Sequence, residues 1–134
     1  MGWSTSSTAT SATYSAGGSY TANAAATLYA VWQINTYTVS FDANGGTGAP
    51  DSQTKTYGTA LTLSSTKPTK NSTTTTGSKI TFNANGGTTT KASETATDTI
   101  KYTFSNWNTA TDGSGTSYNS GGSYTTNAST TLYA

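Results

Sequence analysis

The sequence predicts a mostly β protein made of small, elongated repeat modules with little or no helix. The first observation is a duplication: residues 2–30 align with residues 106–134 without a gap, at a constant offset of 104. The second is the period-two alternation of apolar and polar residues that half-buried strands show. The third is composition, with 34 Thr, 19 Ser and only 31% hydrophobic residues. Thin β modules fit these observations better than one thick core.

The duplicated segment, which we call the tail, occupies residues 3–32 and again residues 102–134. Each copy runs from a Trp through Gly-Gly-Ser-Tyr to Leu-Tyr-Ala, and the last residues alternate as a strand does. The matching positions are Trp3 and Trp107, Tyr14 and Tyr118, Tyr20 and Tyr124, and Leu28 and Leu132.

A second repeated segment, which we call the head, occupies residues 37–70 and 78–100. Phe41 and Phe82 lie 41 positions apart, and each is followed at the same distance by Ala-Asn-Gly-Gly. Before each Phe, apolar and polar residues alternate, which predicts a strand that ends in a turn. The order along the chain is therefore tail, head, head, tail.

This order predicts two modules. The first covers residues 1–70 and the second covers residues 71–134, each with one head and one tail. The head at 37–70 has three possible partners: the preceding tail, the following tail, or only itself as a hairpin. The opening Met-Gly-Trp also suggests an initiator methionine joined to the interior of a longer repeat protein.

The repeated Asn-Gly-Gly predicts a tight turn. Asn and Gly both tolerate the positive φ that a type I′ turn requires at its two central residues. The alternative is a phosphate-binding loop, which needs a helix directly after it. No helical pattern follows either copy, so the turn is favoured. The predicted turn residues are Asn44, Gly45 and Gly46, and Asn85, Gly86 and Gly87.

Large aromatic side chains are expected to supply most of the core, since each buries much area. The expected core aromatics are Trp3, Trp32, Phe41, Phe82, Phe104 and Trp107. Four tyrosines near Gly-Gly turns have two readings: they belong to the same cores, which is favoured, or they stack on sugar rings. These are Tyr14, Tyr20, Tyr118 and Tyr124.

Composition excludes several function classes. The net charge is +1, with six Lys and no Arg, so no basic patch points to nucleic acid. The chain has no Cys, which excludes disulfides and thiolate metal sites and suits an exported bacterial protein. No stretch approaches the roughly 20 apolar residues of a membrane-spanning helix.

The segments YTVSFDANGGTGAPDSQTKTYGTALTLSSTKPT and NWNTATDGSGTSYNSGGSYTTNASTTLYA resemble the Listeria–Bacteroides repeat, or internalin B-repeat, family. The resemblance covers nearly the whole chain. It implies a small β-grasp-like fold, tandem copies in secreted or wall-anchored proteins, and a role in spacing, adhesion or receptor contact. It implies no catalytic residues. The second head, which interrupts the family's order after Thr69, is the one departure from its pattern.

Residues for chemistry are scarce. The chain has no His, and its five carboxylates form no obvious pair for acid–base catalysis. The stretch from Asp112 to Tyr118 faintly resembles a calcium loop, but a turn is favoured because the first tail has no acid there. Lys79 and Lys101 adjoin strand cores, where the alternative is an internal cross-link from Lys to Asn or Asp, but alternation favours the polar face for both. We expect no enzyme activity and no cofactor.

The expected function is therefore a non-catalytic repeat of an extracellular protein on the bacterial cell surface, which spaces or displays a binding domain. The alternative is a carbohydrate- or receptor-binding module of a phage tail fibre, on the virion, or of a secreted protein. Expected partners are the neighbouring repeats and a host-surface glycan or protein, with end-to-end self-association through exposed strand edges.

Overall fold

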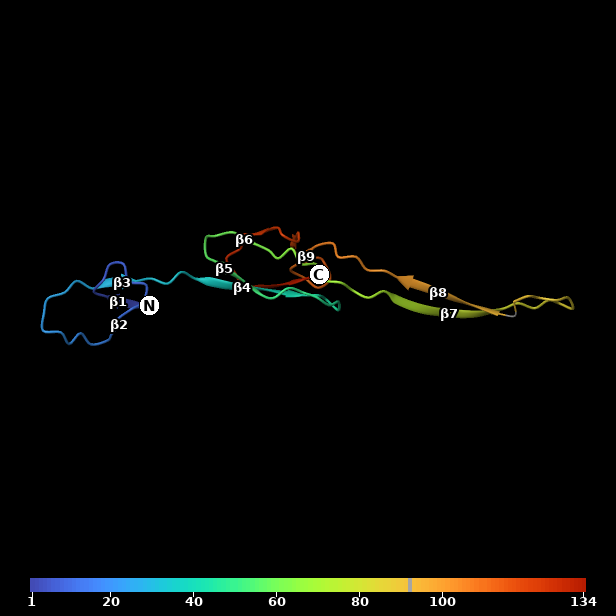
Figure 1. Cartoon of the computed structure of the whole chain (residues 1–134), viewed down its shortest axis with the longest axis horizontal. Helices are drawn as coiled ribbons and strands as arrows, with labels where there is room; N and C mark the ends of the chain where they lie inside the picture. The colour runs from blue at the N-terminus through green and yellow to red at the C-terminus, as the bar shows by residue number, and fades with distance from the viewer. Residues whose placement is uncertain (92) are drawn as a thin grey trace.

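The computed structural model describes residues 1–91 and 93–134. The molecule is elongated, with a small sheet at the N-terminal end, a larger module in the middle and a long hairpin at the other end (Figure 1). Within the described residues all regular structure is β-strand. The mostly β fold class predicted from the sequence is confirmed.

The first tail forms a three-stranded antiparallel sheet. Its strands are β1 (Gly2–Ser4), β2 (Tyr14–Ser15) and β3 (Tyr29–Val31), in the order β2-β1-β3. Trp3 lies opposite both Tyr14 and Ala30. The strand expected at the end of the tail is present, and it lies at the edge of its sheet.

The middle module contains a five-stranded sheet in the order β10-β9-β12-β4-β5. One half comes from the first head, as β4 (Thr36–Asp42) and β5 (Gln53–Thr56). The other half comes from the second tail, and the two halves meet where β12 lies parallel to β4. The tail strands are β9 (Trp107–Asn108), β10 (Ser117–Tyr118) and β12 (Thr130–Tyr133).

A small ribbon closes the same module. It pairs β6 (Leu61–Thr62) of the head with β11 (Ser123–Tyr124) of the tail. The head at 37–70 therefore pairs with the tail at 102–134, which answers the question that the sequence left open. The expected boundary between residues 70 and 71 falls inside this module, between its two halves.

The second head stands apart as a two-stranded antiparallel hairpin. Its strands are β7 (Thr73–Thr81) and β8 (Ser93–Ile100), which project from the middle module (Figure 1). Every residue of β7 is exposed. β-branched Thr favours extended backbone, and its hydroxyl tolerates solvent on both faces of the hairpin.

The two Asn-Gly-Gly segments are turns. Asn44 and Gly45 have φ of 49° and 81°, while Asn85 and Gly86 have φ of 46° and 91°. In the first turn the Gly46 amide donates to the Ala43 carbonyl at 2.9 Å, and the second turn repeats this bond. Neither turn joins its two strands directly, since residues 43–52 separate β4 from β5. After the first turn the chain pairs instead through Thr47 with Thr69.

The core lies between the head and the tail of the middle module. Its buried members are Val39 and Leu63 from the head, and Trp107, Tyr124 and Leu132 from the tail. Phe41, Leu61, Phe104 and Tyr118 pack against them. Phe41 and Phe104 meet the Trp107 ring edge-on, with centroids 4.9 and 5.1 Å apart.

Three of the expected core aromatics lie outside any core. Trp3 is 42% exposed, Trp32 is 87% exposed and Phe82 is 43% exposed. The cause is architectural: a core forms only where a head covers a tail. The first tail has no head against it, and the second head has no tail, so the aromatic residues of both stay in solvent.

Candidate functional site

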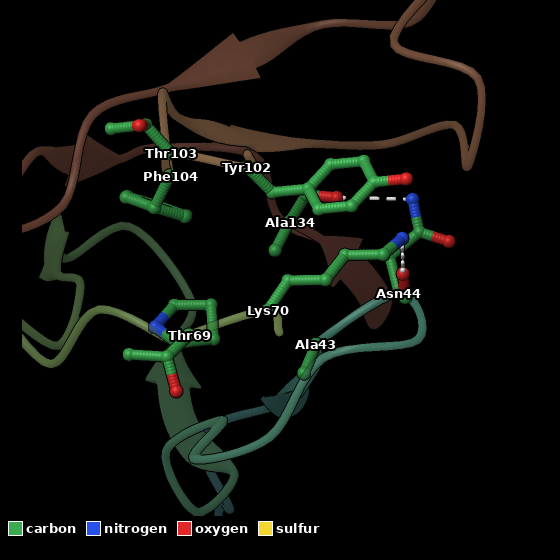
Figure 2. A pocket seen from close by; sticks show the side chains of 9 residues that line it. Ala43, Asn44, Thr69, Lys70, Tyr102, Thr103, Phe104 and Ala134 are labelled. Carbon is green, nitrogen blue, oxygen red and sulfur yellow. Dashed lines mark hydrogen bonds between the residues drawn. The ribbon is translucent and has the colours of Figure 1, made fainter. Parts of the chain in front are cut away.

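The contact between the head and the tail of the middle module is the most specific arrangement in the molecule. The Asn44 side-chain amide donates to the main-chain oxygens of Thr111, at 2.8 Å, and Ala134, at 3.0 Å. The Lys70 ammonium donates to the Asn44 carbonyl at 3.0 Å. Asn44 therefore shapes its own turn and also ties the head to the tail (Figure 2).

A cavity of about 470 Å³ opens beside Asn44. The Lys70 ammonium lies 5.0 Å from the centroid of the Tyr102 ring, and Figure 2 shows both side chains at this cavity. The side chains in this lining offer an amide, hydroxyls and one ammonium, and none of them is acidic. Its lining is Ala43, Asn44, Pro68, Thr69, Lys70, Tyr102, Thr103, Phe104 and Ala134.

A buried lysine makes a second link between head and tail. Lys55 on β5 is only 1% exposed, and its ammonium donates to the Thr56 carbonyl at 2.8 Å and to Asn127 Oδ1 at 2.9 Å. The same Asn127 oxygen accepts a bond from the Gly58 amide at 3.2 Å. Within the described residues, no carboxylate lies within 4.0 Å of Lys55. Two neutral oxygens therefore carry the hydrogen bonds of this cation.

The burial of Lys55 could not be predicted, because a lysine in an alternating strand resembles a residue that faces solvent. The lysines singled out for a Lys–Asn cross-link, Lys79 and Lys101, are both exposed. The Lys55 ammonium does contact the Asn127 side chain, but among the described residues no carboxylate lies within 4.0 Å of Lys55 to assist a cross-linking reaction.

The loop around Asp112, which faintly resembles a calcium site, is held together by the side-chain amide of Asn108. Asn108 Nδ2 donates to the carbonyls of Gly113, at 3.0 Å, and Gly115, at 3.2 Å, while its Oδ1 accepts from the Ala110 and Gly115 amides. The side chain of Asn108 thus occupies the centre of the loop. The equivalent residue in the first tail is Ser4. This difference between the two copies was the only sign in the sequence that Asn108 has a special role.

Asp112 is engaged by its own turn. Its Oδ1 accepts bonds from the Ser114 hydroxyl at 2.7 Å and the Ser114 amide at 3.0 Å, and these bonds lower the pKa of the Asp112 carboxyl. In the described part of the chain, no three His, Cys, Asp or Glu side chains gather closely enough to hold a metal ion. The loop is therefore a turn stabilised by side chains.

The four tyrosines weighed as sugar contacts form two matching pairs. Tyr118 and Tyr124 have ring centroids 5.3 Å apart, and Tyr14 and Tyr20 have centroids 5.4 Å apart. Tyr124 is 2% exposed and its hydroxyl donates to the Ala128 carbonyl at 3.0 Å, so it is a core residue. Tyr20 is 37% exposed. Of the two pairs, only Tyr14 and Tyr20 in the first tail are therefore open to a ligand.

Comparison with known proteins places this architecture in a family. The model of the Listeria-Bacteroides repeat domain matches residues 37–77 and 79–134. The chain belongs to the Listeria-Bacteroides repeat family. The resemblance seen in the sequence is thereby confirmed. The second match runs through the second head into the second tail, whereas the structure pairs that tail with the first head.

A protein of Evansella cellulosilytica, described as a Gly-rich membrane protein, is 53% identical over 36 residues. The match covers 27% of this chain and 4% of that protein. No solved structure matches the chain. In residues 1–91 and 93–134, no helix has the length and apolar character needed to cross a membrane.

We expect the substitution Asn44→Ala to destabilise the middle module by about 1–3 kcal/mol, because it removes two side-chain bonds between head and tail. Urea unfolding followed by tryptophan fluorescence measures this change, since Trp107 is the buried reporter. The matched control is Asn85→Ala, which alters the same turn in a head that touches no tail. Equal shifts in both variants would show that Asn44 acts only in its turn.

The stability of the module is expected to fall at alkaline pH. Burial raises the pKa of the Tyr124 hydroxyl above its ordinary value of 10.0, and the neighbouring Tyr118 adds to this effect. A raised folded-state pKa gives stability that is complete below about pH 10 and is lost as the pH rises through the folded value. The thermal midpoint recorded from pH 7 to 11 tests this. Tyr124→Phe should reduce the alkaline decline, whereas Tyr20→Phe, in the exposed copy, should leave it unchanged.

Proposed function

We propose that the chain is a non-catalytic part of a bacterial cell-surface protein, in which serial modules space or display a binding domain. Membership of a repeat family supports this proposal. The observation that carries it is the serial layout of the molecule: the first tail, the middle module and the second head follow one another along its long axis (Figure 1). A polypeptide laid out in this way gains length with each unit.

The composition of the surface favours an extracellular location. Only 8% of the residues are charged, Thr and Ser are the most frequent side chains, and thiols are absent. A thiol-free chain is indifferent to the oxidising conditions outside the cell. The phage virion is the alternative location. Antibodies against the chain should label intact cells of the producing bacterium, and labelling that requires permeabilised cells would contradict the surface proposal.

Carbohydrate binding is the alternative function. Exposed aromatic rings on the first tail support it, since Trp3, Tyr20 and Tyr29 are each more than one third exposed. The second tail speaks against it, because the equivalent rings of Trp107 and Tyr124 are buried. The aromatic face is exposed in the first tail and buried in the second. This difference fits a core face that lacks its cover better than a surface for binding sugar. Saturable binding on a glycan array, abolished by Tyr20→Ala, would reverse this preference.

The spacer proposal predicts an extended particle in dilute solution. A compact domain of 134 residues has a radius of gyration of about 14 Å. Small-angle X-ray scattering, extrapolated to zero concentration, should give a clearly larger value with a distance distribution skewed towards long distances. A value near that of a compact domain would mean that the tail and the second head fold back on the middle module, and the spacer proposal would fail.

A further inference from the structure

The structure leaves one tail without a head and one head without a tail, at opposite ends of the molecule (Figure 1). We propose that these ends join between copies: β7 of one chain adds as a parallel strand beside β3 of a second chain. The first tail of each copy would then be covered by the second head of another. The partner is therefore a second copy of this chain, and the contact surface is the uncovered aromatic face of the first tail.

The first tail is folded as if a head were present. Ser4 lies opposite Tyr29, as Asn108 lies opposite Tyr133 in the second tail. The Tyr20 hydroxyl donates to the Ala24 carbonyl at 3.2 Å, and the equivalent Tyr124 hydroxyl donates to the Ala128 carbonyl at 3.0 Å. The tyrosine pairs match within 0.1 Å in centroid separation, at 5.4 and 5.3 Å. The pairing at Ser4 and the tyrosine pair thus already match those of the covered tail, whereas residues 26–28, which correspond to Thr130–Leu132 of β12, lie just before β3.

The difference between the tails is exposure. Trp3 is 42% exposed where Trp107 is fully buried, and Tyr20 is 37% exposed where Tyr124 is 2% exposed. In the second tail the covering residues come from the head, since Phe41 lies edge-on against Trp107. The same positions of the first tail therefore lack only a head. Covering these two aromatic side chains would remove their remaining apolar surface from water, which favours the contact.

The outer edge of β3 in the first tail corresponds to the edge of β12 that pairs with β4 in the middle module. In the middle module β12 has β9 on one side and β4 on the other. In the first tail β3 has β1, the counterpart of β9, on one side. Within the described residues nothing pairs with its other side. An unpaired strand edge is a template for another strand.

Near the end of β7 the second head repeats the register of the strand pair that covers the second tail, whereas an irregularity between Thr76 and Lys79 shifts the register earlier in the hairpin. Val39 lies opposite Gln53, and Ile80 lies opposite Glu94, so both partners are shifted by the same 41 positions. Thus β8 occupies the place of β5, and β7 occupies the place of β4. Among residues 1–91 and 93–134, no strand pairs with the edge of β7 that corresponds to the edge β4 gives to β12. Ile80 and Phe82, the counterparts of Val39 and Phe41, are 54% and 43% exposed.

The two unpaired edges lie at opposite ends of one molecule with the middle module between them (Figure 1). Joining them within one chain would require the middle module to open. Joining them between chains leaves the middle module closed and requires only that β3 extend towards residue 26. The two surfaces differ, so each contact leaves another tail and another head available. Such a heterologous contact produces open chains of molecules rather than a closed dimer.

The middle module also fixes the register of the proposed contact. Thr131 lies beside Ser40 and Leu132 lies beside Phe41 in the parallel pair. The same offsets place Thr27 beside Thr81 and Leu28 beside Phe82 of a second copy, so the contact begins in the residues just before β3 and extends past the end of β7. Residues 2–32 carry no charge, so Lys79 in β7 meets no like charge there.

The contact between copies should be weaker than the contact within the middle module. The counterpart of Lys55 in the second head is Ala96, so the hydrogen bond to the tail amide is missing. The second head also passes directly into the second tail without a copy of the β6 ribbon. Association is therefore expected to increase with concentration and to reverse on dilution.

Cross-linking between two cysteine variants tests both the contact and its register. The chain has no native Cys, so Thr27→Cys and Thr81→Cys can be made singly and mixed. A short bis-maleimide should give covalent dimers in the mixture. The matched control replaces Thr81→Cys by Thr97→Cys, which lies on β8 of the same hairpin. Its yield should be several-fold lower. Ser40→Cys with Thr131→Cys in one chain is the positive control for the spacing.

Sedimentation of the uncrosslinked chain gives the second readout. The full chain should shift from monomer to larger species as concentration rises, and Phe82→Ser should abolish this shift. Tyr57→Ser, which removes a 55% exposed aromatic from the middle module, should leave it unchanged. Equal cross-linking at positions 81 and 97, or a chain that stays monomeric at all concentrations, would overturn the inference. Neither result would affect the spacer proposal, which needs only modules in series.

Discussion

The parallel contact between β4 and β12 holds together the one complete head–tail module in the part of the chain that the structure describes. Parallel strands need a long connection, and here about 90 residues separate the two partners along the chain. The second head lies between β4 and β12 in the sequence. It is therefore an insertion between the two halves of one module. The buried residues confirm this role: two of the five come from the head and three from the tail. Neither half has enough apolar surface to bury itself.

That dependence explains the uneven burial of residues that look alike in the sequence. Trp107 is packed between Phe41 and Phe104, whereas Trp3, in an equivalent local fold, stays in solvent. The hydrogen bonds follow the same rule, because Lys55 and Asn44 both reach across from head to tail. Heads and tails each fold alike in both copies, but the core cluster forms where the first head packs on the second tail.

Much of the fold could be predicted because it is encoded locally. Alternation around Val39 and Phe41 indicated β4, and the Asn-Gly pairs indicated backbone with positive φ. The fixed offsets between copies indicated which segments would fold alike. These signals concern a residue and its near neighbours, which the sequence displays directly.

The choice of partner could not be predicted, because duplication makes the candidates equivalent. Both heads carry the same Phe and the same turn, so local pattern cannot tell which one covers the second tail. The incorrect core positions of Trp3, Trp32 and Phe82 follow from this single ambiguity. Lys55 and Asn108 were missed for a different reason: a polar residue reveals its burial only through partners that are distant in the chain or in the loop.

The most direct test of the architecture is a nuclear Overhauser experiment on aromatic protons of the dilute chain. The account predicts cross-peaks between the Phe41 ring and the Trp107 indole, whose centroids are 4.9 Å apart. Cross-peaks from Phe41 to Trp3 would instead place the first head on the first tail. Cross-peaks from Phe82 to Trp107 would place the second head on the second tail. Either result would contradict the pairing on which the module depends.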